Sequence, residues 1–181
     1  MVAVTISLPA QTAPSAPVAA GMKQLKDHVA EAWKSLTPSG RLPASSELRL
    51  ALSLPLRNPE ELSAMLVDVY DPASANFHHY LTPEEFTARF GATATDYEAV
   101  ANYATTNGLR VIEQHSNRLV LDVAGPVANI EQAFHVALRT YHHPQEARDF
   151  YAPDVEPTVS AQLPLLQVSG LNNYAMRMGR G

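Results

Sequence analysis

Residues 48–61 read LRLALSLPLRNPEE and contain a transition from strand to helix around which the rest of the fold can be predicted. Leucine occupies every second position from Leu48 to Leu56, a spacing that places side chains on one face of a β-strand. Pro55 lies on the other face, so we expect the strand to end there or to run along a sheet edge. The run Asn58-Pro59-Glu60-Glu61 predicts a helix start, because Asn favours the N-cap and Pro the first helical position.

Helix signals continue downstream of this start. The first helix should bury an apolar stripe formed by Leu62, Met65, Leu66 and Val69. A second helix is expected at Thr82-Pro83-Glu84-Glu85, which has the pattern of a capping box, and Gly91 should close it. A third is expected at about residues 96–106, followed by Asn107-Gly108.

Strand signals return after the third helix. Residues 109–114 and 118–124 predict two strands joined by a turn at residues 115–117. A helix with Val127, Ile130 and Phe134 on its inner face should follow Gly125-Pro126, and residues 136–141 predict another strand. The order strand, helix, strand, strand, helix, strand predicts an α+β fold, with a ferredoxin-like split βαβ antiparallel sheet, helices on one face and short inserted helices.

The N-terminal region has a different character. Residues 1–21 are rich in Ala, Pro and Ser and lack a basic start, so we interpret them as a flexible leader and not as a signal peptide. Helical spacing predicts an amphipathic helix at residues 21–37, with the apolar positions Met22, Leu25, Val29, Trp33 and Leu36. We therefore divide the chain into a leader at 1–43, a domain at 44–171 and a connector at 172–181.

Composition narrows the classes of function. The 181 residues carry a formal charge of −5 and a pI of about 5.8, which offers no general attraction to nucleic acid. No apolar run reaches membrane-spanning length. The absence of cysteine excludes disulfides, thiolate metal sites and a cysteine nucleophile. Neither a nucleophile elbow nor a phosphate-binding glycine loop is present, so we predict no catalytic residue.

Two histidine pairs, His78-His79 and His142-His143, raise the question of a metal site. Four imidazoles on loops would be able to share one ion, and an enzyme that uses zinc is therefore an alternative. Adjacent histidines on a strand point to opposite faces, however, and no acidic residue flanks either pair closely in the sequence. We predict that all four are structural and that the chain binds no metal or cofactor.

One stretch resembles a known family. The run Phe77-His78-His79-Tyr80-Leu81-Thr82-Pro83-Glu84-Glu85-Phe86, followed by Phe90-Gly91 and Tyr97, is similar to the signature of the activation prodomain of sedolisins, the kumamolisin-like serine-carboxyl peptidases. Residues 116–120, 127–134, 150–153 and 168–171 also look like parts of that family. The resemblance covers about residues 44–172, and its motif residues are Phe77, His78, His79, Tyr80, Leu81, Thr82, Glu85, Phe86, Phe90 and Gly91.

The resemblance implies a propeptide of a secreted acid endopeptidase, which acts as intramolecular chaperone and inhibitor until it is cleaved off. Its partner would be a sedolisin-type peptidase domain, in which the family's catalytic residues lie. The candidate cleavage connector is expected to be extended and poorly structured, and its residues are Asn172, Asn173, Tyr174, Arg177 and Arg180. Because the chain carries seven histidines, we also expect acid to weaken the complex. The alternative is a free-standing ferredoxin-like inhibitor or interaction module.

Overall fold

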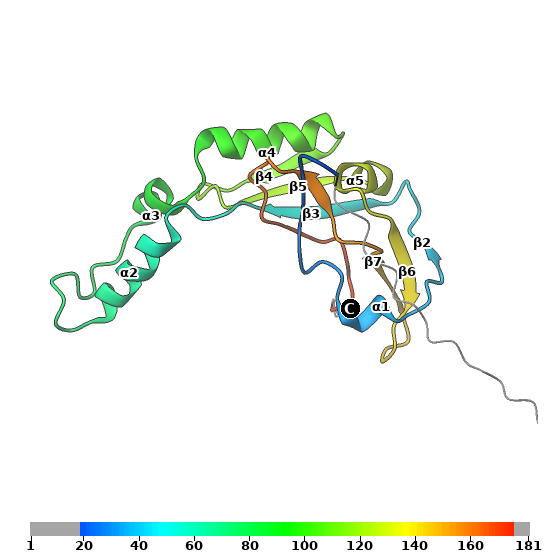
Figure 1. Ribbon diagram of the computed structural model, residues 1–181, viewed down its shortest axis with the longest axis horizontal. Coiled ribbons are helices and arrows are strands. Elements are labelled where there is room, and N and C mark those ends of the chain that lie inside the picture. Colours follow the sequence, from blue (N-terminus) through cyan, green and yellow to red (C-terminus); the bar gives the residue numbers. More distant parts are fainter. Residues whose placement is uncertain (1–18, 176–181) are drawn as a thin grey trace, which may run out of the picture.

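The computed structural model, which describes residues 19–175, is organised around a four-stranded antiparallel sheet. The strand order is β4-β5-β3-β9, with the bounds β3 Glu47–Ser53, β4 Arg110–Gln114, β5 Val120–Pro126 and β9 Gln167–Ser169. Two helices, α4 Ala94–Thr106 and α5 Val127–Phe134, lie on one side of this sheet (Figure 1). The predicted α+β class is therefore confirmed.

Strand β3 lies in the interior of the sheet. It pairs with β5 along its whole length and with β9 through Ala51–Ser53. The strand ends before Pro55, as one alternative predicted, and the alternative of an edge position is wrong. Strand β5 is antiparallel to both of its neighbours, so it separates the parallel pair β3 and β4. This arrangement agrees with a split βαβ order for the first three strands.

The fourth position of the sheet differs from the prediction. It is taken by β9, whereas the strand predicted at 136–141 is observed as β6 Leu138–His142 in a separate sheet with β2 Gly40–Arg41 and β7 Asp149–Pro153. The reason is local pairing, because residues 149–153 return alongside β6 as its antiparallel partner. The ferredoxin-like classification consequently stays a prediction.

The main core lies between the sheet and the two helices. Its side chains with at most 2% exposure include Leu50, Leu52, Leu121, Val123, Val100, Ile130 and Phe134. Alternation along β3 and β5 sends the intervening Arg49, Ala51 and Asp122 to the opposite face of the sheet. Burying each large aliphatic or aromatic side chain stabilises the fold by roughly 1.5–3 kcal/mol. The face that carries these side chains is therefore the one packed against the helices, and the other face of the sheet stays open.

A second, smaller core joins the two ends of the described chain. Trp33, Tyr141, Phe150 and Ala152 are buried together, with Tyr174 packed against them. Trp33 belongs to α1 Glu31–Lys34, and Phe150 lies on β7 with its ring 5.2 Å from that of Tyr141. The N-terminal and C-terminal segments therefore share one aromatic cluster.

The helix predicted at residues 21–37 is wrong in most of its length. Residues 22–24 form β1 Met22–Gln24, which pairs with β8 Thr158–Ser160, and only α1 is helical. Asp27 has a φ of 66°, which interrupts any helix at that point. The Glu156 carboxylate accepts hydrogen bonds from the amides of His28 and Val29, so a distant side chain replaces helical bonding. The leader at residues 1–18 lies outside the described residues.

Helices α2 Pro59–Tyr70 and α3 Pro83–Phe90 form an arm, residues 59–90, that extends from the sheet beside the end of β3 (Figure 1). The expected buried stripe on α2 is wrong, because only Val69 is buried and Leu66 is 49% exposed. Asn58 stands at the N-cap position, but its side chain makes no capping bond and instead donates to the carbonyl of Arg89. Helices therefore cover the sheet at α4 and α5, whereas α2 projects away from it.

Candidate functional site

The family motif lies in the loop between the two helices of the arm and carries a ladder of aromatic rings. The rings of Phe77 and His78 stack at 3.8 Å, those of His78 and Tyr80 at 6.1 Å, and Tyr80 meets Tyr70 edge-on at 6.5 Å. His78 has a φ of 59°, and its amide donates to the carbonyl of Val69 at 3.0 Å. The loop is therefore fixed by backbone bonds, while Tyr80 remains 64% exposed.

The second half of the motif anchors α3. The Thr82 hydroxyl accepts from the Glu85 amide at 3.2 Å, and the Glu85 carboxylate accepts from the Thr82 amide at 2.9 Å. This reciprocal capping box confirms the predicted helix start. Leu81 is half-buried beside the helix start, Phe86 packs on Phe90 at 5.5 Å, and Phe90 is fully buried.

Gly91 ends α3 at a point where two backbones approach closely. A Cβ there would stand 2.5 Å from the carbonyl oxygen of Asn117 and 2.8 Å from that of Thr87, which no real side chain tolerates. Arg57 and Arg118 reinforce this junction by donating to the carbonyls of Gly91 and Ala92 at 2.5 and 2.6 Å. The base of the arm is therefore firmly joined to the β4–β5 hairpin.

The two histidine pairs occupy separate parts of the molecule. His78 and His79 are exposed on the arm, whereas His142 ends β6 and His143 follows it, at the other end of the molecule (Figure 1). His143 stacks on Tyr174 at 4.6 Å and accepts from the Gln145 amide. No acidic residue directly flanks either pair in the sequence, but the pairing of β6 with β7 brings Asp149 Oδ1 to 2.5 Å from His142 Nδ1. The four imidazoles do not converge, and their structural role stays a prediction.

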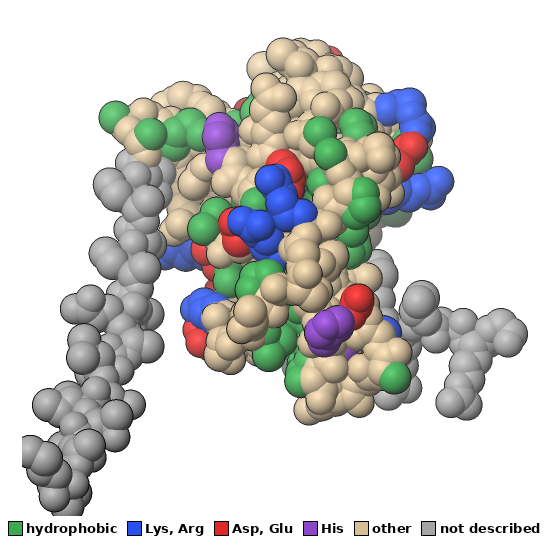
Figure 2. Space-filling view, turned by 90° about the vertical axis from the view of Figure 1, so that its right-hand side faces the viewer, with side chains coloured by type: hydrophobic (Ala, Val, Ile, Leu, Met, Phe, Trp, Pro, Cys, Tyr) green, Lys and Arg blue, Asp and Glu red, His purple; other side chains and the backbone are tan. Residues whose placement is uncertain are grey.

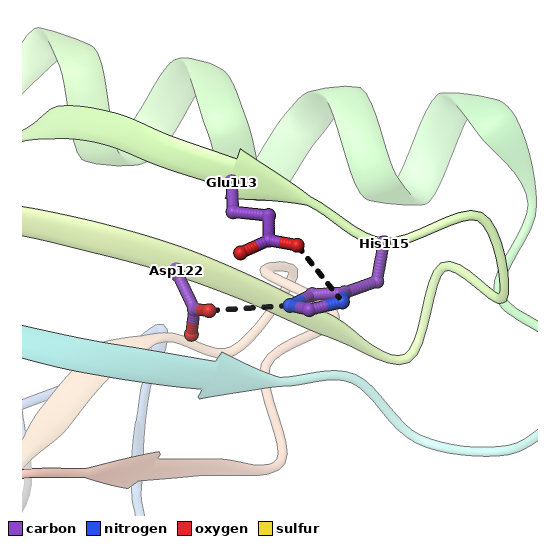
Figure 3. A group of neighbouring side chains, drawn as sticks. All are labelled: Glu113, His115 and Asp122. Carbon is purple, nitrogen blue, oxygen red and sulfur yellow. Dashed lines mark hydrogen bonds and ion pairs between the residues drawn. The ribbon is translucent and has the colours of Figure 1, made fainter.

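A cluster that sequence reasoning missed lies on the open sheet face and consists of Glu113, His115 and Asp122 (Figure 3). His115 Nε2 is 3.2 Å from Asp122 Oδ2, and Nδ1 is 3.9 Å from Glu113 Oε1. Each ring nitrogen faces its own carboxylate, although one ligand atom from each of the three residues lies within 4.8 Å of the others. This geometry fits a histidine paired on both sides better than a metal centre. The predicted hairpin did not contain this pairing, because a turn at residues 115–117 is too short to bring Glu113 opposite Asp122, as is observed.

This cluster borders a shallow hollow on the same face, which Arg49, Ala51, Ile112 and Ser169 help to line. The face lies opposite α4 and is built from the polar half of the strand alternation. Figure 2 shows another face of the molecule, on which basic and acidic side chains lie side by side. The ion pairs Arg41–Glu131 and Arg139–Asp154 belong to the small sheet β2-β6-β7 and its neighbours.

The first residues of the predicted connector are held by the fold. Asn173 Oδ1 accepts from the Tyr151 amide at 2.7 Å, and the Asn173 carbonyl accepts from Arg148 Nη1 at 3.1 Å. Tyr174 packs on Trp33 at 5.5 Å, and its carbonyl also accepts from Arg148. Asn172 is half-buried. The expectation of a poorly structured connector is therefore wrong for residues 172–174, and Arg177 and Arg180 lie outside the described residues.

Comparison with known protein families identifies this architecture. The model of the pro-kumamolisin activation domain matches residues 34–174, which include the whole arm, the sheet and the anchored residues 172–174. The chain belongs to this family. The resemblance to sedolisin prodomains is therefore confirmed, and the chain is an activation domain of the kind found in sedolisin-family precursors.

Three curated relatives agree with the family assignment. Xanthomonalisin from Xanthomonas sp. (strain T-22) is 33% identical over 138 residues, which make up 75% of this chain and 16% of the relative. Sedolisin from Pseudomonas sp. (strain 101) is 28% identical over 60% of this chain and 18% of its own length. Kumamolisin from Bacillus sp. (strain MN-32) is 28% identical over 72% and 24%. The activation domain thus spans between 16% and 24% of the length of these relatives.

Within residues 19–175 no helix is long and apolar enough to cross a bilayer. Of the seven histidines, all of which lie in this range, His28 alone is buried. Its Nε2 accepts from the Val168 amide at 3.1 Å, so it links the N-terminal segment to β9.

Proposed function

We propose that this activation domain inhibits a sedolisin-type peptidase domain of its own precursor and assists the folding of that domain. Membership of the activation-domain family over residues 34–174 is the observation that carries the proposal. The short share of each relative that the chain matches supports it, because a precursor of this kind has most of its length outside the activation domain. The domain itself is proposed to have no catalytic role.

The open sheet face and the anchored C-terminal residues give this proposal a physical basis. A sheet that is already folded offers a fixed surface of Arg49, Asp122 and Ser169 on which a slowly folding partner can order. Arg148 holds Asn173 and Tyr174 against the body, so the chain leaves the domain at a defined point. We place the cleaved bond after this anchor, at Arg177 or Arg180, where release does not require the core to open. By analogy with the family, the precursor is proposed to be secreted.

The experiment measures inhibition of the mature peptidase of the same precursor by the separately expressed 181-residue chain. We expect tight inhibition at pH 7, faster recovery of activity when the denatured peptidase refolds with the chain present, and weaker inhibition at pH 4. Absence of both inhibition and assisted refolding would refute the proposed function. A reading frame without a downstream peptidase domain would favour the free-standing inhibitor, and affinity that is unchanged at pH 4 would remove acid release.

A further inference from the structure

Helix α2 carries an apolar stripe that the described chain leaves uncovered. Leu66, Val67 and Tyr70 are 49%, 71% and 66% exposed, and their spacing of three and four residues places them on one side of the helix. The acidic residues Glu61 and Asp68 lie elsewhere around the helix, and Glu61 pairs with Arg89 of α3. An amphipathic helix usually buries such a stripe, so α2 has the sequence of a packed helix without the packing partner.

The aromatic ladder extends this stripe onto the neighbouring loop. Tyr80 contacts Tyr70 edge-on, and His78 stacks between Phe77 and Tyr80. We name the group Leu66, Val67, Tyr70, His78 and Tyr80 the arm patch. Single exposed apolar residues are ordinary, but neighbouring ones with large aromatic members are typical of interaction surfaces.

The arm patch is presented by a fixed structure. The loop that carries it is closed by backbone bonds from His78 to Val69 and from Phe77 to Ser74, at 3.0 and 3.2 Å. At the other end, Arg57 and the close contact at Gly91 hold the arm to the hairpin. A surface that is ordered before binding loses less conformational entropy when its partner docks.

We propose that the arm patch docks on the peptidase domain of the precursor and forms a second contact beside the open sheet face. This inference rests on the proposed function and names a surface for it. Two observations favour this occupant. The relatives are at least four times longer than the part that the chain matches, so a large partner is covalently supplied. In addition, Tyr174 packs on Trp33 of α1, so the chain leaves the domain beside α1, and Figure 1 shows α1 and α2 on the side of the sheet away from α4.

A second copy of the chain fits the arm patch less well. Stable interfaces bury about 20–30 residues on each side. The arm patch has five residues, so on its own it is too small for a dimer and fits better as one part of a larger composite interface. The open sheet face, which would complete such an interface, lies on the side of the sheet away from α4, as α2 does (Figure 1).

The test substitutes Val67→Lys and compares it with Val155→Lys. Both valines are exposed, at 71% and 50%, but Val155 lies outside the arm. A lysine at position 67 lies in the last turn of α2, where the helix dipole favours a positive charge, and Asp71 four residues later carries a negative one. The substitution should therefore leave the fold intact. Thermal unfolding checks this point. Binding of each 181-residue variant to the separately produced mature peptidase domain is measured by calorimetry, and inhibition is measured in parallel.

We expect Val67→Lys to weaken binding by about tenfold or more, as burial of a charge in an apolar contact requires, while Val155→Lys binds like the wild type. Equal binding by both variants would overturn the docking role of the arm patch, even if the wild type inhibits well. Wild-type binding without either inhibition or assisted refolding would refute the proposed function, yet the Val67→Lys result would still decide the inference. Wild-type dimerisation that Val67→Lys abolishes, with peptidase binding unchanged, would assign the patch to a second copy and also overturn the proposal. Failure of the wild type to bind would overturn both.

Discussion

The hydroxyl of Tyr103 joins the two helices that cover the sheet, and its removal should have a measurable cost. Tyr103 lies on α4, donates to the carbonyl of Ala133 in the last turn of α5, and packs on Phe134 with ring centres 6.3 Å apart. The carbonyls of a last helical turn have no partner within the helix, so this phenol supplies one. Tyr103→Phe keeps the ring and removes only the bond. We expect a loss of about 1–2 kcal/mol in the free energy of unfolding, from the bond and the carbonyl left without it.

The same hydroxyl makes this cost depend on pH. Burial raises the pKa of Tyr103 from 10.0 to about 12, so between these values the folded protein keeps a proton that the unfolded chain loses. Because the folded state then binds more protons, the stabilisation is complete below pH 10 and is lost as the pH rises from 10 toward 12. A difference of one full proton would lower the free energy of unfolding by about 1.4 kcal/mol for each pH unit. Because the phenol is partly open to solvent, we expect a total loss of roughly 1 kcal/mol between pH 10 and pH 11.

The assay is urea unfolding of wild type and Tyr103→Phe at pH 8 and pH 11, followed by circular dichroism and by fluorescence of Trp33. The difference between the two proteins should be about 1–2 kcal/mol at pH 8 and smaller by roughly 1 kcal/mol at pH 11. Burial also raises the pKa of Tyr97, Tyr141 and Tyr151, and taking the difference between variants removes their contribution. Equal stability of the two proteins at pH 8, or a difference that does not change with pH, would refute the role given to the hydroxyl.

Three further predictions concern residues of the motif and the histidines. Thr82→Ala should remove the capping box and destabilise α3 by about 0.5–2 kcal/mol, which amide exchange in residues 83–90 would detect as faster exchange. Thr82→Ser, the control, should keep the slow exchange. Unchanged exchange in the alanine variant would contradict this prediction. His28→Phe should lower the free energy of unfolding by about 1–3 kcal/mol, because the buried Val168 amide loses its acceptor. His142→Phe, on the exposed surface, should change it by less than about 0.5 kcal/mol. Similar effects of the two substitutions would count against the link between His28 and β9. Replacing His78, His79, His142 and His143 by Gln should leave the zinc content at zero, and stoichiometric zinc in the wild type with unfolding by a chelator would contradict their structural role.

Local signals predicted local structure well in this chain. The capping box at Thr82, the closing glycine at Gly91 and the helix after Gly125-Pro126 follow from residue types within a few positions, and all three are observed. The hairpin at residues 109–124 was predicted for the same reason, but its observed turn is longer than the predicted one at 115–117 and brings Gln114 opposite Leu121 and Glu113 opposite Asp122. Cross-strand neighbours are counted from the turn, and the predicted turn of three residues would have placed Glu113 opposite Leu119, so the cluster with Asp122 did not follow from the sequence.

Features that depend on distant residues were not predictable from periodicity. The apolar spacing at residues 21–37 has a helical period, but Leu25 and Trp33 are buried in different clusters, and Glu156 binds the amides between them. The alternation at 136–141 indicated a strand without saying which sheet it joins. On α2 the stripe at Leu62 and Leu66 was correctly recognised as apolar, but a pattern of this kind cannot say whether its cover belongs to the same chain.

The anchoring of Tyr174 has a consequence for what a protease cut can achieve. A break in the chain after this residue removes none of the contacts that Trp33, His143 and Phe150 make with the tyrosine ring. The severed piece therefore keeps these contacts. In the proposed precursor it would lose only the advantage of being tethered, namely a high effective concentration near the peptidase domain. Under the proposed function, the cut by itself would change an intramolecular equilibrium into a bimolecular one, and dilution, acid or a second cut within the folded body would be needed to complete the separation.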